Sequence, residues 1–203
     1  MSNMLESLQL NIAFFPVITT IKSSTFFILL FMDQVITQRN IRTISNYLCR
    51  AGIVFEAFHH EPVLTCEEGK KIAQNAGAHC CKSLLLRNKK RFFLFVIPPD
   101  DRFSAKEASE FLGCGHLSFA AEEELAELLG TFRGAVCLLG LIFDKEHKVE
   151  LILDEKILNC DFINCHPCTN DQSWEISMKE ITDHLLPSLG YSYRVFKKSD
   201  PFA

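Results

Sequence analysis

Several patterns that would identify a function by themselves are missing from this sequence. Its nine cysteines do not form the two C-x2-C knuckles of a typical structural zinc site, so no metal site is predicted. No G-x-x-x-x-G-K motif is present, which argues against a P-loop nucleotide site. No internal repeat or low-complexity segment occurs either. The sequence therefore offers no sign of a zinc module or a P-loop protein, and no cofactor is predicted.

A net positive charge is missing as well. The formal charge is −4 at pH 7, whereas proteins that cover long stretches of nucleic acid usually carry a broad basic surface. The exception is a local basic cluster at residues 87–91. Any nucleic acid is therefore expected to be held locally, and DNA is not predicted as a partner.

What the chain does contain is enough apolar sequence for a substantial core. It has 203 residues, of which 48% are hydrophobic, and this length fits one globular domain, alone or with an appendage. The cysteines are irregularly spaced, as is typical of thiols in a reducing compartment. We therefore predict a cytoplasmic protein without disulfides.

The N-terminal segment is apolar and aromatic, but it matches neither a secretory signal nor a membrane span. Glu6 is the only charged residue before Lys22, so the basic start of a signal is missing, and Lys22 interrupts the apolar run. We predict that residues 1–31 are a weakly structured extension, that residues 32–196 form the functional domain and that residues 197–203 are a polar tail. Membrane association through the extension is the less favoured alternative.

Helix and strand signals alternate through the functional domain. Capping boxes begin at Thr65, Ser104 and Ser177, and glycines mark helix ends. Helices are expected at residues 34–51, 65–77, 104–113, 121–129 and 177–189, with a helical turn at 157–158. Strands are expected at 53–59, 82–86, 92–97, 134–143, 149–153, 162–163 and, as the last one, 174–176, with 144–148 as a hairpin turn. This alternation predicts an α/β or α+β domain around one mixed sheet.

A lysine at the entrance of an apolar hairpin is the first functional candidate. Residues 84–86 and 92–97 are apolar runs of strand length around a short charged turn. Lys82 stands where the first strand begins, and an unpaired buried ammonium is costly, so its amine must reach water or bind an anion. The residue pattern alone favours an amine that reaches water.

Two other chemistries are less well supported by the residues. A Cys–His nucleophile pair is not favoured, because no cysteine has a recognisable local signature. His166, followed by Pro167, stands at the end of a predicted strand, where a histidine faces a pocket mouth or a tight turn. A structural role is favoured for it on sequence alone. Composition and spacing therefore do not name a reaction.

Four ordered segments nevertheless resemble a known family. They are GAHCCKSLLL (77–86), LSFAAEEELAELLG (117–130), GAVCLLGLI (134–142) and CHPCTND (165–171). Together they resemble the stand-alone prolyl-tRNA editing proteins, which are homologous to the editing insertion of bacterial prolyl-tRNA synthetase. The resemblance covers about residues 33–195. It implies an α/β (α+β) fold, a single domain with a central mixed, largely antiparallel sheet surrounded by helices.

The resemblance also implies an enzyme, an aminoacyl-tRNA deacylase that hydrolyses the ester of a mischarged tRNA. Alanine on proline tRNA is the typical substrate of the family. Water attacks the ester with help from a ribose hydroxyl of the tRNA, and no side chain forms a covalent intermediate. The implied partners are the acceptor end of tRNA and, beyond it, prolyl-tRNA synthetase or an elongation factor.

Roles for individual residues follow from the same resemblance. Lys82 matches the family's essential lysine, which would hold the acceptor end through a phosphate or ribose oxygen. The backbone amides of Gly134, Ala135 and Val136 match a loop that would stabilise the developing oxyanion. His166 matches a pocket histidine of the family.

Further candidates for substrate binding are Thr169 and Asn170, which accompany this histidine, and Ser83. Two positions depart from the family pattern: Ser83 replaces an asparagine, and Arg133 replaces a proline. These departures leave two alternatives open. One is a non-catalytic module of the same fold that binds tRNA or a synthetase, and the other is a deacylase for another amino acid, such as cysteine or serine.

Overall fold

The computed structural model describes residues 24–63 and 79–198. The chain divides into two compact units, Met1–Ile36 and Thr37–Ala203, with the boundary inside helix α1 (Ser24–Arg50). Residues 1–23 of the predicted extension and the predicted helix at 65–77 with its Thr65 capping box lie outside the described residues. Within the described part, none of the helices is both long and apolar enough to cross a membrane.

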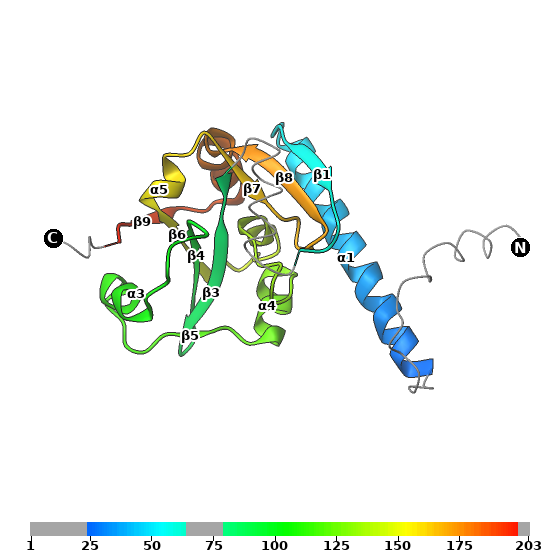
Figure 1. Ribbon diagram of the computed structural model, residues 1–203, viewed down its shortest axis with the longest axis horizontal. Coiled ribbons are helices and arrows are strands. Elements are labelled where there is room, and N and C mark those ends of the chain that lie inside the picture. Colours follow the sequence, from blue (N-terminus) through cyan, green and yellow to red (C-terminus); the bar gives the residue numbers. More distant parts are fainter. Residues whose placement is uncertain (1–23, 64–78, 199–203) are drawn as a thin grey trace, which may run out of the picture. The chain divides into compact units, whose positions relative to one another are not determined.

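The strands of the second unit form two sheets, and Figure 1 shows how they are arranged. The four-stranded sheet has the order β1 (Glu56–His59), β8 (Gln172–Ser177), β7 (Phe162–Cys165) and β2 (His79–Cys80). The five-stranded sheet has the order β5 (Ser118–Phe119), β3 (Lys82–Asn88), β4 (Arg91–Ile97), β6 (Val149–Asp154) and β9 (Tyr193–Phe196).

The predicted fold class is confirmed, since the second unit is a mixed α/β domain. Antiparallel pairs join β1 to β8, β7 to β8, β3 to β4 and β3 to β5, whereas β2–β7, β4–β6 and β6–β9 are parallel. The structure differs from the prediction in having two sheets where one was expected. A sheet's strand order depends on pairing between distant segments, which local patterns do not encode.

The predicted apolar hairpin is confirmed as β3 and β4, which pair from Lys82 opposite Ile97 to Asn88 opposite Arg91. Its side chains alternate between two cores, because successive residues of a strand point to opposite faces. Phe93 and Phe95 on β4 face the smaller core, whereas Leu94 and Val96 face the larger one. All four side chains are fully buried, and each burial contributes about 2 kcal/mol to folding.

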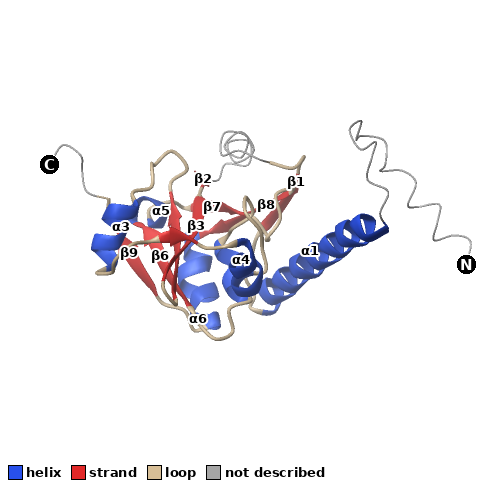
Figure 2. Cartoon of the chain, turned by 90° about the horizontal axis from the view of Figure 1, so that it is seen from below, coloured by secondary structure: helices blue, strands red, loops and turns tan. Residues whose placement is uncertain are grey.

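Helices cover both faces of the five-stranded sheet. Helix α3 (Ala105–Leu112) closes the smaller core with Ala108 and Leu112. Helix α4 (Glu122–Leu129) and the last helical segment, which consists of a π-helical part η3 (Glu180–Leu185) and α6 (Leu186–Leu189), pack in the larger core. Figure 2 shows the strands in red between α3, α4 and α6. The larger core also holds side chains of the four-stranded sheet, so it lies between the two sheets.

Local signals located the helix ends well. Ser104 caps α3 by accepting a hydrogen bond from the Glu107 backbone N–H at 3.3 Å, and Gly113 ends it in the left-handed conformation. Gly130 ends α4 in the same way, and α5 (Glu155–Leu158) contains the predicted helical turn. Helix α1 includes the helix expected at 34–51, but it begins earlier, at Ser24.

The strand predicted at residues 134–143 is wrong. Residues 138–142 form a 3-10 helix, η2 (Leu138–Ile142), which Cys137 caps by accepting the Leu139 N–H at 3.4 Å. Every residue of η2 is buried, so the continuous apolar run reflects burial on all sides. Such a run is equally compatible with a buried helix, and periodicity cannot separate the two.

Two further predictions fail for related reasons. Residues 144–148 are not a hairpin turn, because the segment before them is not a strand and β6 pairs in parallel with β4 and β9. The last strand is β9, not residues 174–176, which belong to β8. Strand β9 is a four-residue edge strand with three exposed residues, and it is defined by its pairing with the distant strand β6.

Candidate active site

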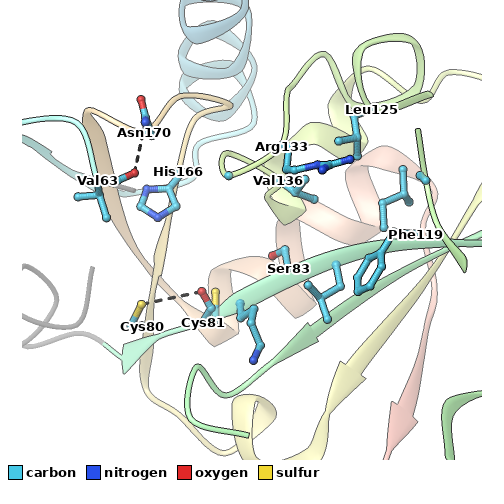
Figure 3. Close-up of a pocket in the computed structure, with 15 residues that line it drawn as sticks. Val63, Cys80, Cys81, Ser83, Phe119, Leu125, Arg133, Val136, His166 and Asn170 are labelled. Atoms are coloured by element: carbon cyan, nitrogen blue, oxygen red, sulfur yellow. Dashed lines mark hydrogen bonds between the residues drawn. The ribbon is translucent and has the colours of Figure 1, made fainter. Parts of the chain in front are cut away.

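A cavity of about 510 Å³ lies where the chain passes from the four-stranded sheet to the five-stranded sheet. This passage occurs at Cys81, between β2 and β3. The cavity is lined by Val63, Cys80, Cys81, Lys82, Ser83, Leu84, Leu85, Phe119, Ala120, Leu125, Arg133, Gly134, Val136, His166 and Asn170. Figure 3 shows His166 and Asn170 on one side of it, and Val136, Arg133, Leu125 and Phe119 on the other.

Most of the site residues predicted from the sequence line this one cavity. They come from three separate segments and are Lys82, Ser83, Gly134, Val136, His166 and Asn170. Ala135 and Thr169 are buried next to the cavity lining without being part of it. The Thr169 hydroxyl donates to Asp171 Oδ1 at 2.6 Å, which stabilises the loop that carries its neighbour Asn170.

The amine of Lys82 is half-buried and bound to the loop that follows β4. Its Nζ donates to the carbonyl oxygen of Asp101 at 2.8 Å and lies 3.4 Å from that of Pro99. An ammonium group has three N–H donors. Two backbone carbonyls account for two of them, which leaves one N–H for a further acceptor. The structure thus places the lysine at the cavity with a fixed amine rather than with one extended into water.

Residues 132–135 form a tight turn between α4 and η2, and Val136 follows it. Gly134 has a φ of 94°, a value that residues with a side chain rarely adopt. The Ala135 N–H donates to the Phe132 carbonyl at 3.0 Å, and the Ala135 carbonyl accepts from the Thr131 hydroxyl at 2.8 Å. Among the described residues, the amides of Gly134 and Val136 have no such hydrogen-bond acceptor. Both residues line the cavity.

At the position where the family resemblance implies a proline, Arg133 is bonded to the carboxylate of Glu122. The Arg133 backbone N–H donates to Glu122 Oε1 at 2.8 Å, and the Arg133 Nε lies 3.8 Å from Glu122 Oε2. A proline has no N–H and restricts the chain through its ring instead. The hydrogen bond to Glu122 ties the start of the turn to α4, and the Arg133 side chain remains 80% exposed at the cavity.

His166 follows the last residue of β7, and its ring orientation is determined by a backbone carbonyl. Its Nδ1 lies 2.9 Å from the Gln172 carbonyl oxygen, and a carbonyl can only accept, so Nδ1 carries the hydrogen of the neutral ring. Nε2 is then the acceptor. Burial lowers the pKa of His166 below its usual value of 6.5, and the nearby His60 lowers it further. His166 is therefore neutral at pH 7.

The loop with His166 and Asn170 is held against the segment after β1. The Asn170 side-chain amide donates to the Val63 carbonyl at 3.2 Å, and the Val63 N–H donates to the Asn170 carbonyl at 2.7 Å. His60 adds a hydrogen bond between its Nε2 and the Ser173 hydroxyl at 2.8 Å. These contacts define one wall of the cavity.

Burial keeps the thiol beside the lysine in its neutral form. Burial raises the pKa of Cys81 well above its usual value, and the neighbouring thiols raise it further, so Cys81 is a neutral thiol at pH 7. Its Sγ donates to the Asn164 carbonyl at 3.4 Å. In the described part of the chain, no group of three or more His, Cys, Asp or Glu side chains is placed to hold a metal ion.

Sequence reasoning did not assign part of the cavity lining. Cys81 and Leu84 are next to Lys82 in the sequence, so proximity could have indicated them. Phe119 and Leu125 belong to a segment quoted for the family resemblance, but they reach the cavity only through the pairing of β5 with β3 and the packing of α4. No local pattern distinguishes them from core residues.

Comparison with known proteins identifies the family. Residues 60–184 match the model of the aminoacyl-tRNA editing domain, which is more than half of the chain. The chain therefore belongs to the aminoacyl-tRNA editing domain family.

Individual relatives agree with this family. The chain is 29% identical over 131 residues to the prolyl-tRNA editing protein ProX of Acetoanaerobium sticklandii, a match that covers 64% of this chain and 80% of that protein. It is 28% identical over 132 residues to the prolyl-tRNA synthetase associated domain-containing protein 1 of Xenopus laevis, which covers 62% and 78% of the two chains. A crystal structure of a candidate trans-editing enzyme for prolyl-tRNA synthetase has the same fold, with a TM-score of 0.61 and 24% identity over 79% of this chain and 98% of that chain.

Proposed function

We propose that this protein is a free-standing aminoacyl-tRNA deacylase that hydrolyses alanine from mischarged proline tRNA in the cytoplasm. The observation that carries the proposal is the meeting of Lys82, the Gly134–Val136 turn and His166 at one cavity, although they come from three separate segments. The reaction adds water to the ester: the water oxygen bonds to the carbonyl carbon, the bond to the ribose oxygen breaks, and this oxygen takes a proton.

Lys82 holds the acceptor end of the tRNA in this proposal. Its amine is oriented by the carbonyls of Asp101 and Pro99, so the remaining N–H has a defined direction before the substrate binds. A compact ammonium suits a phosphate or ribose oxygen. An oriented donor loses little freedom on binding, so more of its interaction energy remains for positioning the ester.

The turn at Gly134 polarises the ester carbonyl. The amides of Gly134 and Val136 are the proposed donors to the oxyanion, and Ala135 supports them because its own N–H maintains the turn through Phe132. Fixed backbone donors directed at developing negative charge are among the strongest contributors to catalysis of acyl transfer. The hydrogen bond from the Arg133 N–H to Glu122 helps to keep this turn in shape.

His166 binds the amino acid through an acceptor nitrogen. With Nδ1–H donated to the Gln172 carbonyl, Nε2 accepts a hydrogen bond from the ammonium group of the aminoacyl ester. Ser83 and Asn170 complete the polar lining. The attacking water is activated by a ribose hydroxyl of the tRNA, as no side chain in the lining is proposed as a nucleophile.

The deciding experiment compares wild type with Lys82→Ala in a deacylation assay on alanyl-tRNA with the proline anticodon. Wild type is expected to accelerate hydrolysis, and Lys82→Ala to reduce the single-turnover rate at least about a hundredfold, because both anion binding and positioning are lost. Lys90→Ala, which removes an exposed lysine from the β3–β4 turn, is the matched control and is expected to retain the wild-type rate. Equal rates for Lys82→Ala and wild type would overturn the proposal.

A second function is supported by Ser83 and Arg133, the two departures from the family pattern. They favour either a module that binds the acceptor end without hydrolysis or a deacylase for another amino acid. A panel of charged tRNAs separates these functions. Binding of the charged tRNAs without hydrolysis of any of them indicates the non-catalytic binding module. Hydrolysis of cysteinyl- or seryl-tRNA in place of alanyl-tRNA indicates a deacylase for that other amino acid. The same panel with prolyl-tRNA synthetase or an elongation factor added tests these partners.

A further inference from the structure

We propose that Phe119 and Arg133 form a nucleotide subsite at the mouth of the cavity, in which the terminal base of a single-stranded RNA end stacks on Phe119 and its phosphate pairs with Arg133. This inference rests on the proposed function for its place in the reaction and deepens it, since it names the groups that would recognise the nucleic-acid part of the substrate.

The first observation is an aromatic ring that lines the cavity and is nevertheless open to solvent. Phe119 is 63% exposed, compared with 44% for Phe162 and 37% for Phe132. A flat aromatic face at a cavity mouth is a stacking platform for any nucleobase. The smaller apolar residues deeper in the lining, such as Leu125, are buried and shape the interior instead.

The backbone that carries this platform is held by hydrogen bonds. Phe119 lies on the edge strand β5, where it pairs with Leu86 of β3, and the next residue, Ala120, donates its N–H to the Leu85 carbonyl at 3.0 Å. A ring on a strand that is bonded on both sides of its own position loses little conformational freedom when a base stacks on it. Stacking on such a ring therefore costs less entropy than stacking on a ring in a loop.

The second observation is a cation at the same cavity whose head group is accessible. The side chain of Arg133 is 80% exposed, and its ion pair with Glu122 is long, with 3.8 Å between Nε and Oε2. An exposed pair of this kind contributes little, so the guanidinium can bind a phosphate, for which its planar set of donors is well suited. Lys82, by contrast, has only one N–H left after its two carbonyl contacts, and the proposed function uses that donor to hold the acceptor end.

An aromatic platform and a guanidinium at one cavity mouth match the two parts of a nucleotide. An apolar amino-acid side chain would use the ring but leave the cation without a partner, and a free phosphate would do the reverse. On helix α4, Glu124 is paired with Arg87, so the charge of that carboxylate is partly offset.

A cycle of protein and RNA variants tests the stacking. The probe is an uncharged five-nucleotide RNA ending in CCA, together with the same RNA lacking its terminal base, and binding is measured by fluorescence anisotropy. Removing the base is expected to weaken binding to wild type about tenfold. Phe119→Leu is expected to bind both RNAs equally weakly, whereas Phe119→Tyr retains the preference. Phe162→Leu, an exposed phenylalanine outside the cavity lining, is the control and should match wild type.

The salt dependence tests the phosphate contact. Arg133→Gln is expected to reduce the slope of log Kd against log salt by about 0.7, the value for one phosphate contact in a single strand. An unchanged slope, no measurable binding by wild type, or an equal effect of base removal in wild type and Phe119→Leu would each overturn the subsite. If Phe119→Leu altered amino-acid preference without weakening RNA binding, the ring would belong to the amino-acid pocket and the proposal would be wrong.

These outcomes are separable from those of the deacylation assay. If the terminal base strengthens binding to wild type but not to Phe119→Leu, and no charged tRNA is hydrolysed, the subsite is supported and the hydrolase is rejected. Lys82-dependent hydrolysis with no coupling between Phe119 and the terminal base supports the hydrolase and rejects the subsite.

Discussion

His166 is the residue whose protonation state matters most for the proposed reaction. Its Nδ1 hydrogen is bound to the Gln172 carbonyl, and Nε2 is an acceptor only while the ring is neutral. Burial lowers its pKa from 6.5, because removal from water disfavours the charged form. The neutral ring is thus maintained to a lower pH than an exposed histidine would allow.

The lowered pKa of His166 determines how the hydrolysis rate should depend on pH. The single-turnover rate on alanyl-tRNA, corrected for spontaneous hydrolysis, is expected to be constant near pH 7 and to fall on acidification, with an apparent pKa below 6.5. Protonation turns Nε2 into a donor that repels the substrate ammonium. Measurements from about pH 5 to about pH 8 span the transition. His166→Gln should lack this transition, and a midpoint above 6.5 in wild type would contradict the assignment.

The sequence predicted the position of Lys82 but not the contacts of its amine. The hairpin pattern located it at the beginning of a strand, and the family resemblance indicated an anion. Neither could reveal that the carbonyls of Pro99 and Asp101 orient its amine. Those carbonyls belong to the turn after β4, and they approach Lys82 only because β3 and β4 pair with Lys82 opposite Ile97.

Among the secondary-structure elements, the apolar segment at 134–142 contains two glycines that have different structural roles. Gly134 supplies a positive φ. Gly140 instead allows close approach: a Cβ at this position would lie 2.8 Å from the Cβ and from the carbonyl oxygen of Leu129. The sequence pattern predicted a strand for this segment.

Gly140→Ala is expected to destabilise the protein by roughly 1 to 3 kcal/mol, because the new methyl group overpacks the contact with Leu129. The measurement is the free energy of unfolding in urea. Gly115→Ala is the matched control, since its added Cβ meets only Asn88 Nδ2 at 3.9 Å, and it should change the stability by less than about 0.5 kcal/mol. Equal stabilities for Gly140→Ala and wild type would show that η2 can move away from α4.

Local chemistry predicted the ends of elements better than their type. Ser104, Gly113 and Gly130 act where the sequence indicated, because a cap depends on residues within one turn. The 3-10 helix η2 was mistaken for a strand because burial on all sides removes the periodicity that distinguishes them. Strand β9 was missed because its pairing with β6 joins segments far apart in the sequence.

For the whole molecule, net charge and site size predict how tRNA binds. A chain of charge −4 that holds only the acceptor end, as proposed above, should contact few phosphates. The slope of log Kd against log salt for full-length tRNA is therefore expected to be positive and between about 1 and 3. Binding measured at several salt concentrations checks this. A slope above about 6 would indicate a broad basic interface, which the charge distribution does not predict.

The sequence by itself determined the fold class, the β3–β4 hairpin, the helix caps and the family, and through the family the candidate residues Lys82 and His166. These depend on short-range patterns and on the order of motifs. Only the tertiary structure decided that the strands form two sheets, that the cavity lies where the chain crosses between them at Cys81, and that Phe119 and Arg133 stand at its mouth. The physical reason is that strand pairing and helix packing join residues far apart in the sequence, and no local pattern records which distant partner each segment will meet.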